Sequence, residues 1–334
     1  MKNSIILFCL TALANLFFGQ NFKQSASYIF GPQNKKITLM TNSNNKKLIL
    51  FKTNMAINTD GTPLSYHPYD LPANTKALNF MENGVAIYRL SDSRCISIPR
   101  KPLSDYPSKY RNNAKFDPSK ISDKEKKEYI SLSRKVFEEW RDAGYPESGV
   151  TGYKIIWKNV IVSKDGKPCV FKDNKQFEGF FGSMTHEQNG LKNDTSECQY
   201  ANQLDPFKIP SIVLNSGIKY EASMGDLIVA YNPNTKKLVY GIIGDSGPGS
   251  NLGEGSIVLN AKLKNVELPK NRDGVKALAI SDNIYIAIIP KSKEYKLVRP
   301  YTEESIVQRA EEWFATQGYN DNDAIIGLLT DNFK

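Results

Sequence analysis

Histidine and cysteine are the scarcest chemically useful residues in this sequence. His67 and His186 are the only histidines among 334 residues, and no CxxC or Cys/His metal-ligand spacing occurs. Zinc sites and Cys/His nucleophile pairs are built from such residues. The composition therefore argues against a histidine-rich metal site and against Cys/His catalysis, and we expect no cofactor.

Long apolar runs are missing after the N-terminus. Residues 1–19 combine one lysine, a short apolar run and the small residue Gly19, which is typical of a secretory signal peptide. No later segment approaches the length of a membrane span. We therefore expect a secreted protein, extracellular or periplasmic, with no membrane partner. Export permits disulfides, and of the three later cysteines we expect Cys169 and Cys198 to pair and Cys95 to be free and buried.

Arginine-rich blocks interleaved with aromatic residues are also absent. The formal net charge is +9, from 44 Lys and Arg against 35 Asp and Glu, but the lysines are spread along the chain in pairs such as Lys35-Lys36 and Lys236-Lys237. This pattern argues against nucleic-acid binding. We interpret the charge as a source of solubility and expect a monomer.

Periodicity predicts two helices and a long β-rich region. Residues 122–143 begin with a capping box and carry apolar residues at helical spacing, and residues 303–317 follow a similar pattern. Between residues 153 and 289 the chain is rich in β-forming residues separated by turns, and we expect strands at 153–162, 177–184, 209–214, 226–231, 237–243, 256–263 and 284–289. Frequent strands without intervening helices indicate a barrel or a sandwich.

The most informative stretch is the glycine-rich segment 240–259, which carries Asp245 and Glu254 nine residues apart. If strands 237–243 and 256–263 pair as a hairpin, both carboxylates face one wide loop. Two separated carboxylates are what acid/base hydrolysis of a glycosidic bond needs. The alternative interpretation is a surface hairpin with solvated acids.

Five ordered motifs resemble the fungal-type chitosanases, glycoside hydrolase family seventy-five. The motifs are Met55-Ala-Ile-Asn-Thr-Asp-Gly61, Phe181-Gly-Ser-Met-Thr185, the segment 198–214, Gly225-Asp-Leu-Ile-Val-Ala-Tyr231, and Tyr240-Gly-Ile-Ile-Gly-Asp-Ser-Gly247 with Leu252-Gly-Glu-Gly-Ser-Ile257. The family usually has alanine in place of Gly255 and an acid in place of Asn58. The same loop is faintly similar to expansin-like double-psi β-barrels.

These resemblances imply a mainly β fold, a six-stranded double-psi-like β-barrel core with added helices. We expect a signal peptide at 1–19, an N-terminal extension at 20–51, a catalytic domain at 52–290 with a helical insertion near 99–150, and a C-terminal helical extension at 291–334. The implied function is inverting endo-hydrolysis of the β-1,4 linkages of chitosan. In that case Glu254 is the general acid and Asp245 the general base, although the exchanged roles stay open.

Because chitosan is a polycation, a basic protein needs a locally acidic cleft to bind it. We expect substrate-binding roles for Asp60, Asp226, Asp205, Thr185 and His186, of which Asp60 is the strongest candidate. The competing interpretation of the acids is turn formation, and the competing interpretation of His186 is an ordinary surface histidine. Two other functions stay open: a non-catalytic polysaccharide-binding protein, and a peptidoglycan-acting barrel protein of the expansin-like type.

Overall fold

The chain forms two compact units, which are described separately. The computed structural model describes residues 21–67, 77–79, 81, 85–92, 94–97, 122–158, 160–171, 178–190, 198, 202–247, 252–295 and 297–333. The expected signal peptide and residues 99–121 of the expected helical insertion lie outside these residues. The described parts of Met1–Ala56, Lys208–Glu267 and Leu278–Lys334 form the barrel unit, and those of Ile57–Phe207 and Leu268–Ala277 form the second unit.

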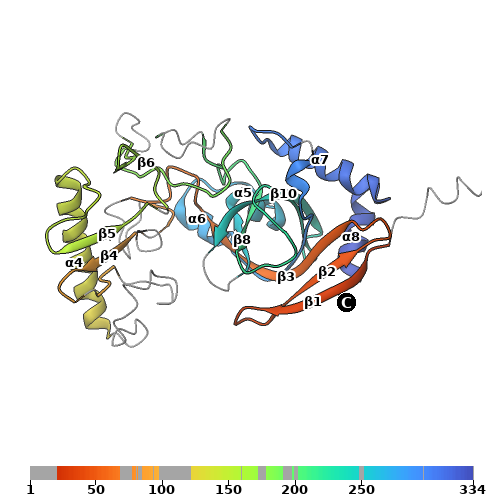
Figure 1. Ribbon diagram of the computed structural model, residues 1–334, viewed down its shortest axis with the longest axis horizontal. Coiled ribbons are helices and arrows are strands. Elements are labelled where there is room, and N and C mark those ends of the chain that lie inside the picture. Colours follow the sequence, from red (N-terminus) through yellow and green to blue (C-terminus); the bar gives the residue numbers. More distant parts are fainter. Residues whose placement is uncertain are drawn as a thin grey trace, which may run out of the picture. The chain divides into compact units, whose positions relative to one another are not determined.

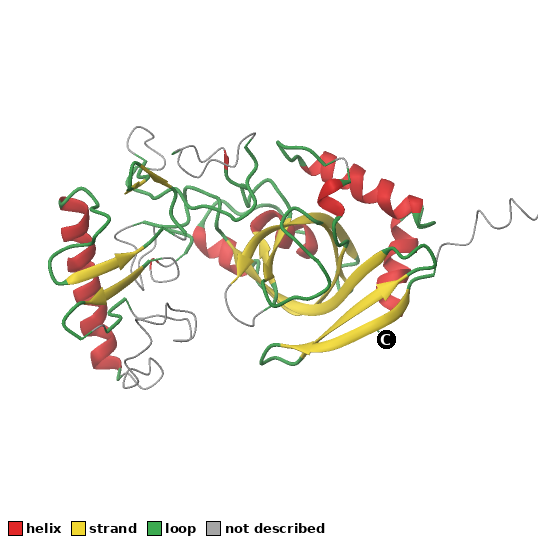
Figure 2. Cartoon of the chain, in the orientation of Figure 1, coloured by secondary structure: helices red, strands yellow, loops and turns green. Residues whose placement is uncertain are grey.

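The barrel unit is built on six strands that close into a ring, in the order β3-β11-β8-β10-β9-β12 and back to β3 (Figures 1 and 2). Their bounds are β3 (Lys47–Asn58), β8 (Ser211–Asn215), β9 (Leu227–Asn232), β10 (Lys237–Gly247), β11 (Glu254–Ser256) and β12 (Ile280–Ile288). The strands β8 and β10 run parallel, whereas β9 pairs antiparallel with both β10 and β12. The predicted fold class, a mainly β protein with a six-stranded barrel and added helices, is confirmed.

Alternating apolar residues fill the inside of the barrel. Ile212 and Leu214 of β8, Ile243 of β10 and Ile286 of β12 belong to one buried cluster. Because successive side chains of a strand point to opposite faces, the residues between them face away from the barrel interior.

Two further strands, β1 (Lys23–Phe30) and β2 (Lys35–Thr41), continue the sheet beyond β3 as an antiparallel ribbon (Figure 1). Helices α7 (Glu303–Thr316) and α8 (Asn322–Asp331) belong to the same unit. They are tied to the strands by stacking of Phe22 on Trp313 and by a hydrogen bond from Tyr240 to Asn322. The expected N-terminal and C-terminal extensions thus pack in one unit with the barrel.

One expected strand, at 256–263, is wrong. Residues Ile257–Lys264 form helix α5. The side chain of Ser256 caps this helix by accepting the backbone N–H of Leu259. Six of the eight residues of α5 are buried. Its polar residues, Asn260, Lys262 and Lys264, alternate with apolar ones as in a strand and do not form the single polar face that marks a surface helix in a sequence. The expected hairpin between this segment and β10 does not form.

The second unit packs helix α4 (Asp123–Asp142) with the strand pair β4 (Ala86–Arg89) and β5 (Tyr153–Ile156). The capping box predicted at Ser122 and Glu125 is present. Trp140 and Trp157 lie in its core cluster. Further elements in the described part of this unit are β6 (Ser163–Lys164), β7 (Lys167–Pro168) and α6 (Arg272–Ala277). The expected strand 153–162 is shorter, and in the described part of 177–184 only isolated bridges form.

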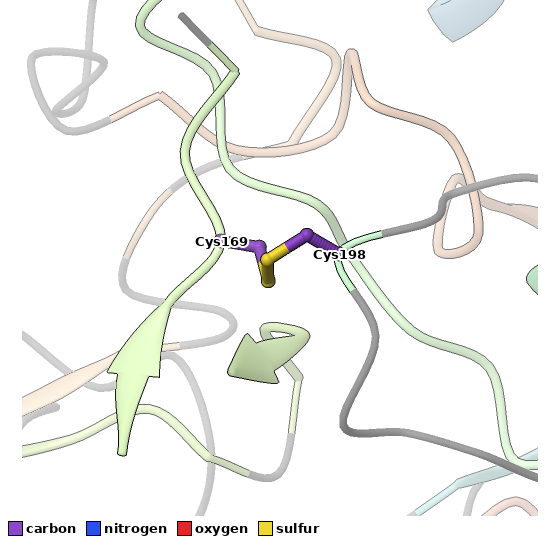
Figure 3. Close-up of a disulfide and its surroundings, with 2 residues drawn as sticks. All are labelled: Cys169 and Cys198. Carbon is purple, nitrogen blue, oxygen red and sulfur yellow. A yellow bond between two sulfur atoms is a disulfide. The ribbon is translucent and has the colours of Figure 1, made fainter. Parts of the chain in front are cut away.

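Cys169 and Cys198, the pair expected from the sequence, are joined by a disulfide in the second unit (Figure 3). Cys95 is free and buried, and burial raises the pKa of its thiol to about 11. Within the described residues, none of the helices has both the length and the apolar character needed to cross a membrane.

Candidate functional site

Asp245 lies on β10 directly after an irregularity in its pairing with β8. Ile243 is opposite Ile212, but Asp245, two residues later, is opposite Val213, only one residue later. The extra residue, Gly244, is therefore a β-bulge. With regular alternation Asp245 would share the inward face of Ile243, and the bulge turns it to the outer face.

Glu254 is the first residue of β11, which pairs antiparallel with the other side of β8 through Gly255 and Ile212. Continuing this register by one residue places Glu254 opposite Val213. Asp245 and Glu254 thus flank the same residue of β8 from its two neighbouring strands. Two strand spacings separate their Cα atoms by about 10 Å.

The two acids share the outer face of the barrel. Val213 is half-buried, whereas its neighbours Ile212 and Leu214 point into the core cluster. Residues directly opposite in a sheet project to the same side. In agreement with this, Asp245 is half-buried and Glu254 is exposed. The pair therefore lies on one accessible face, with β8 between the two carboxylates instead of an open hairpin loop.

The glycines around Glu254 determine where β11 can lie. Gly253 has φ +101°, and a Cβ atom there would lie 2.0 Å from the carbonyl oxygen of Asn54. A Cβ atom at Gly255 would lie 2.6 Å from Oδ1 of Asn260 and 2.9 Å from the sulfur of Met55. The alanine that the chitosanase motif usually carries at this position would not fit here without movement. Close backbone packing of β11 on β3 thus holds Glu254 in place.

Asn260 fastens helix α5 next to this point. The side chain is fully buried, and its Nδ2 donates to the carbonyl oxygens of Met55, Ala56 and Leu278 at 3.2–3.4 Å. The helix that follows Glu254 is therefore locked to the end of β3, which limits movement of the acid.

Asp226 is fully buried and is not exposed to a substrate. Its carboxylate accepts hydrogen bonds from the backbone N–H groups of Ser223, Lys291 and Lys293 at 2.8–3.1 Å, and from the Ser223 hydroxyl. Burial raises the pKa of this carboxyl, although the hydrogen bonds act in the opposite direction. The structure thus gives Asp226 an anchoring role between two loops, not the substrate contact that the sequence suggests.

Asp60 and Thr185 lie close together in the second unit. A Cβ atom at Gly61, next to Asp60, would lie 3.0 Å from Cγ2 of Thr185 and 2.2 Å from the carbonyl oxygen of Leu204. Asp60 is half-buried, and its backbone N–H donates to Asn58 at 2.8 Å. The motifs that resembled a chitosanase at 55–61 and 181–185 therefore meet in space.

The hydroxyl of Thr185 already has two partners. It donates to the carbonyl oxygen of Glu187 at 2.6 Å and accepts the N–H of Leu204 at 3.1 Å. Thr185 is buried, so its role is to join these segments. His186 is exposed, and Asp205 accepts the N–H of Phe207 at 3.0 Å in a turn that precedes the barrel unit.

No local sequence pattern indicates the buried polar contacts of this region. Ser183 accepts the N–H of Gly61 and donates to the carbonyl oxygen of Thr62, and Gln203 accepts the N–H of Thr185. The two bonds of Ser183 join residues 122 and 121 positions apart, and the bond of Gln203 joins residues 18 positions apart. No local pattern could therefore reveal them. Asp60, Thr185, His186 and Asp205 belong to the second unit, and the acid pair belongs to the barrel unit.

Neither a metal centre nor a pocket supplies a competing site in what the structure describes. Among the described residues, no group of three or more His, Cys, Asp or Glu side chains could hold a metal ion. A pocket of about 500 Å³ in the barrel unit lies between β10, α5 and α7, and its lining contains neither acid of the pair. The acid pair is the candidate site with defined chemistry.

Comparison with known proteins adds no further assignment: no protein-family model matches the chain, and no curated protein matches it.

Proposed function

We propose that the protein is a secreted glycoside hydrolase that cleaves β-1,4 linkages of chitosan with inversion, using Asp245 and Glu254. The observation that carries this proposal is the placement of the two acids on one outer face of the barrel, on either side of Val213. A separation of about 6.5–9.5 Å between carboxyl groups leaves room for a water molecule. Side chains on Cα atoms about 10 Å apart can reach that range.

The proposed reaction needs one protonated and one ionised carboxyl. Glu254 donates a proton to the glycosidic oxygen as the bond to the anomeric carbon breaks. Asp245 takes a proton from the water that attacks the anomeric carbon from the opposite face. The products are a free hydroxyl on the leaving sugar and a new reducing end of inverted configuration. Glu254, as the more exposed acid, is the one more accessible to the leaving oxygen.

The charge of the pair also suits an amino sugar. An ionised carboxylate attracts the ammonium groups of glucosamine units, and this local attraction opposes the repulsion from the basic protein as a whole. The acid pair is thus expected to favour deacetylated over acetylated substrate.

The decisive experiment measures release of reducing ends from chitosan by the wild type, Asp245→Asn and Glu254→Gln. Each substitution should lower the rate by at least ~10²-fold, because each removes a proton-transfer group. Glu267→Gln, at an exposed acid outside the site, is the matched control and should retain full activity. Equal activity in all variants would rule out the assigned pair.

The configuration of the first product, followed by NMR, tests the spacing independently. Inversion of a β-linkage predicts the α-anomer first, and an initial β-anomer would contradict an inverting pair. Wild-type protein that is retained on insoluble glycan without producing reducing ends would support the polysaccharide-binding alternative. Release of muropeptides with no effect on chitosan would support the peptidoglycan-acting alternative.

A further inference from the structure

The first part of the chain is basic without compensation by acids. Residues 21–59 contain no Asp or Glu, although the whole chain has 35 in 334 residues, and they contain the lysines Lys23, Lys35, Lys36, Lys46, Lys47 and Lys52. The first arginine of the chain is Arg89. A mixture of acidic and basic residues would keep the protein equally soluble. Solubility therefore does not explain why this segment carries only positive charges.

The structure gathers five of these lysines on the ribbon that extends from the barrel. We call β1, β2 and the segment 42–47 that leads into β3 the lysine ribbon. Lys23 of β1 is opposite Thr41 of β2, and Thr41 is opposite Lys47 of β3, so these residues form one row across three strands. At the other end of the ribbon, Lys35 and Lys36 begin β2. Lys23, Lys36 and Lys46 are exposed, and Lys35 and Lys47 are half-buried.

The ribbon ends at β1, an edge strand in the described sheet (Figure 1). A ribbon of this kind presents a long, narrow surface, and its two lysine-bearing ends are separated by the length of β2. Seven residues of extended strand span about 23 Å. This geometry suits an extended polymer more than a small anion.

A loop after β8 adds aromatic surface and further lysines. Tyr28 of β1 and Tyr220 of the loop are both half-buried, with ring centroids 5.5 Å apart. Lys219 places its ammonium 5.2 Å from the ring centre of Tyr28. Glu221 contacts Lys47 at 3.4 Å and Lys291 at 3.1 Å, so this acid meets two lysines and leaves the surface positive.

We propose that the lysine ribbon is a docking surface for an anionic polysaccharide, distinct from the acid pair. Lysine ammonium groups match carboxylate or sulfate groups repeated along a glycan, and the half-buried Tyr28 and Tyr220 add aromatic surface beside them. DNA is disfavoured because the ribbon has no arginine, the residue that most often reads bases and pairs with phosphates bidentately. A membrane is disfavoured because the described ribbon exposes little apolar surface. Ile29, at 61%, is its only large apolar side chain that is classed as exposed.

The proposal does not depend on chitosan hydrolysis, since it concerns a different surface and a ligand of opposite charge. A docking surface of this kind would hold the protein on an acidic cell wall or extracellular matrix. It also gives the positive net charge of the chain a specific purpose.

The test measures binding of the full-length mature protein to polygalacturonate, a carboxylate-bearing glycan, over a range of salt concentrations. The wild type should bind, with an affinity that falls steeply as salt rises. The double variant Lys35→Gln with Lys36→Gln should bind about tenfold more weakly at low salt and with a shallower salt dependence. Lys236→Gln with Lys237→Gln, at an exposed lysine pair where the turn after β9 leads into β10, is the matched control and should bind like the wild type.

Three further ligands complete the experiment: neutral dextran, duplex DNA, and vesicles containing anionic lipid. The proposal predicts no binding to dextran and weaker binding to DNA and vesicles than to polygalacturonate. Equal losses in the two double variants would show that only net charge matters and would overturn the proposal. Tighter binding to DNA or to vesicles would assign the ribbon to that partner instead. Chitosan hydrolysis is measured for the Lys35→Gln, Lys36→Gln variant and for the wild type. This measurement distinguishes a failure of the docking proposal from a failure of the proposed function.

Discussion

Buried carboxylates can serve folding instead of catalysis, and Asp226 is the example in this molecule. Asp226 lies directly before β9, and four hydrogen bonds link it to Ser223 in the loop before β9 and to Lys291 and Lys293 in the segment after β12. Three of the donors are backbone N–H groups, to which the carboxylate supplies an acceptor. Asp226, a candidate for substrate contact in the sequence, thus holds the loop before β9 to the segment after β12.

Asp226→Asn should lower the free energy of unfolding at neutral pH by about 1–3 kcal/mol, because an amide NH₂ would face backbone N–H donors. Urea unfolding followed by circular dichroism measures this change. The KM for chitosan should stay the same, because the side chain is fully buried. A raised KM with unchanged stability would contradict the anchoring role.

The raised pKa of Asp226 has a defined effect on the pH dependence of stability. A folded pKa above the ordinary value of 3.8 means that folding favours the protonated form. The contribution of this group is therefore fully present below about pH 3.8 and is lost as the pH rises through the folded pKa. Unfolding free energies of the wild type and Asp226→Asn between pH 3 and pH 7 should show this trend in their difference. A difference that does not change with pH would contradict it.

At the scale of elements, the position of β11 depends on glycine. Gly253→Ala places a methyl group against the carbonyl of Asn54 and puts alanine at φ +101°. We expect a loss of more than about 1 kcal/mol in stability together with a loss of activity, since Glu254 is the next residue. Thermal unfolding and reducing-end release measure the two effects.

Two other glycines provide matched controls. At Gly144, with φ +74° and open space around it, alanine should cost only the backbone strain and leave activity unchanged. At Gly327, inside helix α8 and also in open space, alanine should stabilise the protein by about 0.5–1 kcal/mol. Equal effects of alanine at Gly253 and Gly144 would show that close packing is unimportant.

At the scale of the whole molecule, the described residues form a hydrophobic core in each of the two compact units. The disulfide lies in the second unit and closes a loop with a sequence separation of 29 residues. Closing such a loop restricts the unfolded chain and stabilises the fold by about 3–4 kcal/mol.

We therefore expect two transitions in scanning calorimetry, of which only one moves to lower temperature when a reductant is added. Cys169→Ser with Cys198→Ser should reproduce the effect of the reductant. The acid pair lies in the other unit, so the transition that does not move should be the one that coincides with loss of activity. A single transition, or equal shifts of both, would contradict two independent units.

The sequence by itself was sufficient for features set by local chemistry. The capping box at Ser122 and Glu125 and the apolar spacing behind it determine α4, because both depend on residues a few positions apart. Runs of β-forming residues predicted β8, β9, β10 and β12 in nearly their observed places. These runs indicated a barrel or a sandwich, and the resemblance to known families favoured the barrel. The acids Asp245 and Glu254 were visible as candidates because glycine-rich turns surround them.

Only the tertiary structure decided how these pieces combine. It made 257–264 a helix with six buried residues, although the polar residues of this segment alternate with apolar ones as in a strand. It placed β8 between the two acids and turned Asp245 outward through the bulge at Gly244, since strand order and register depend on contacts between distant residues. It also buried Asp226 and gathered the lysines of the first strands on one ribbon. Residue type and spacing determine which groups are present, whereas long-range pairing determines which of them face a partner.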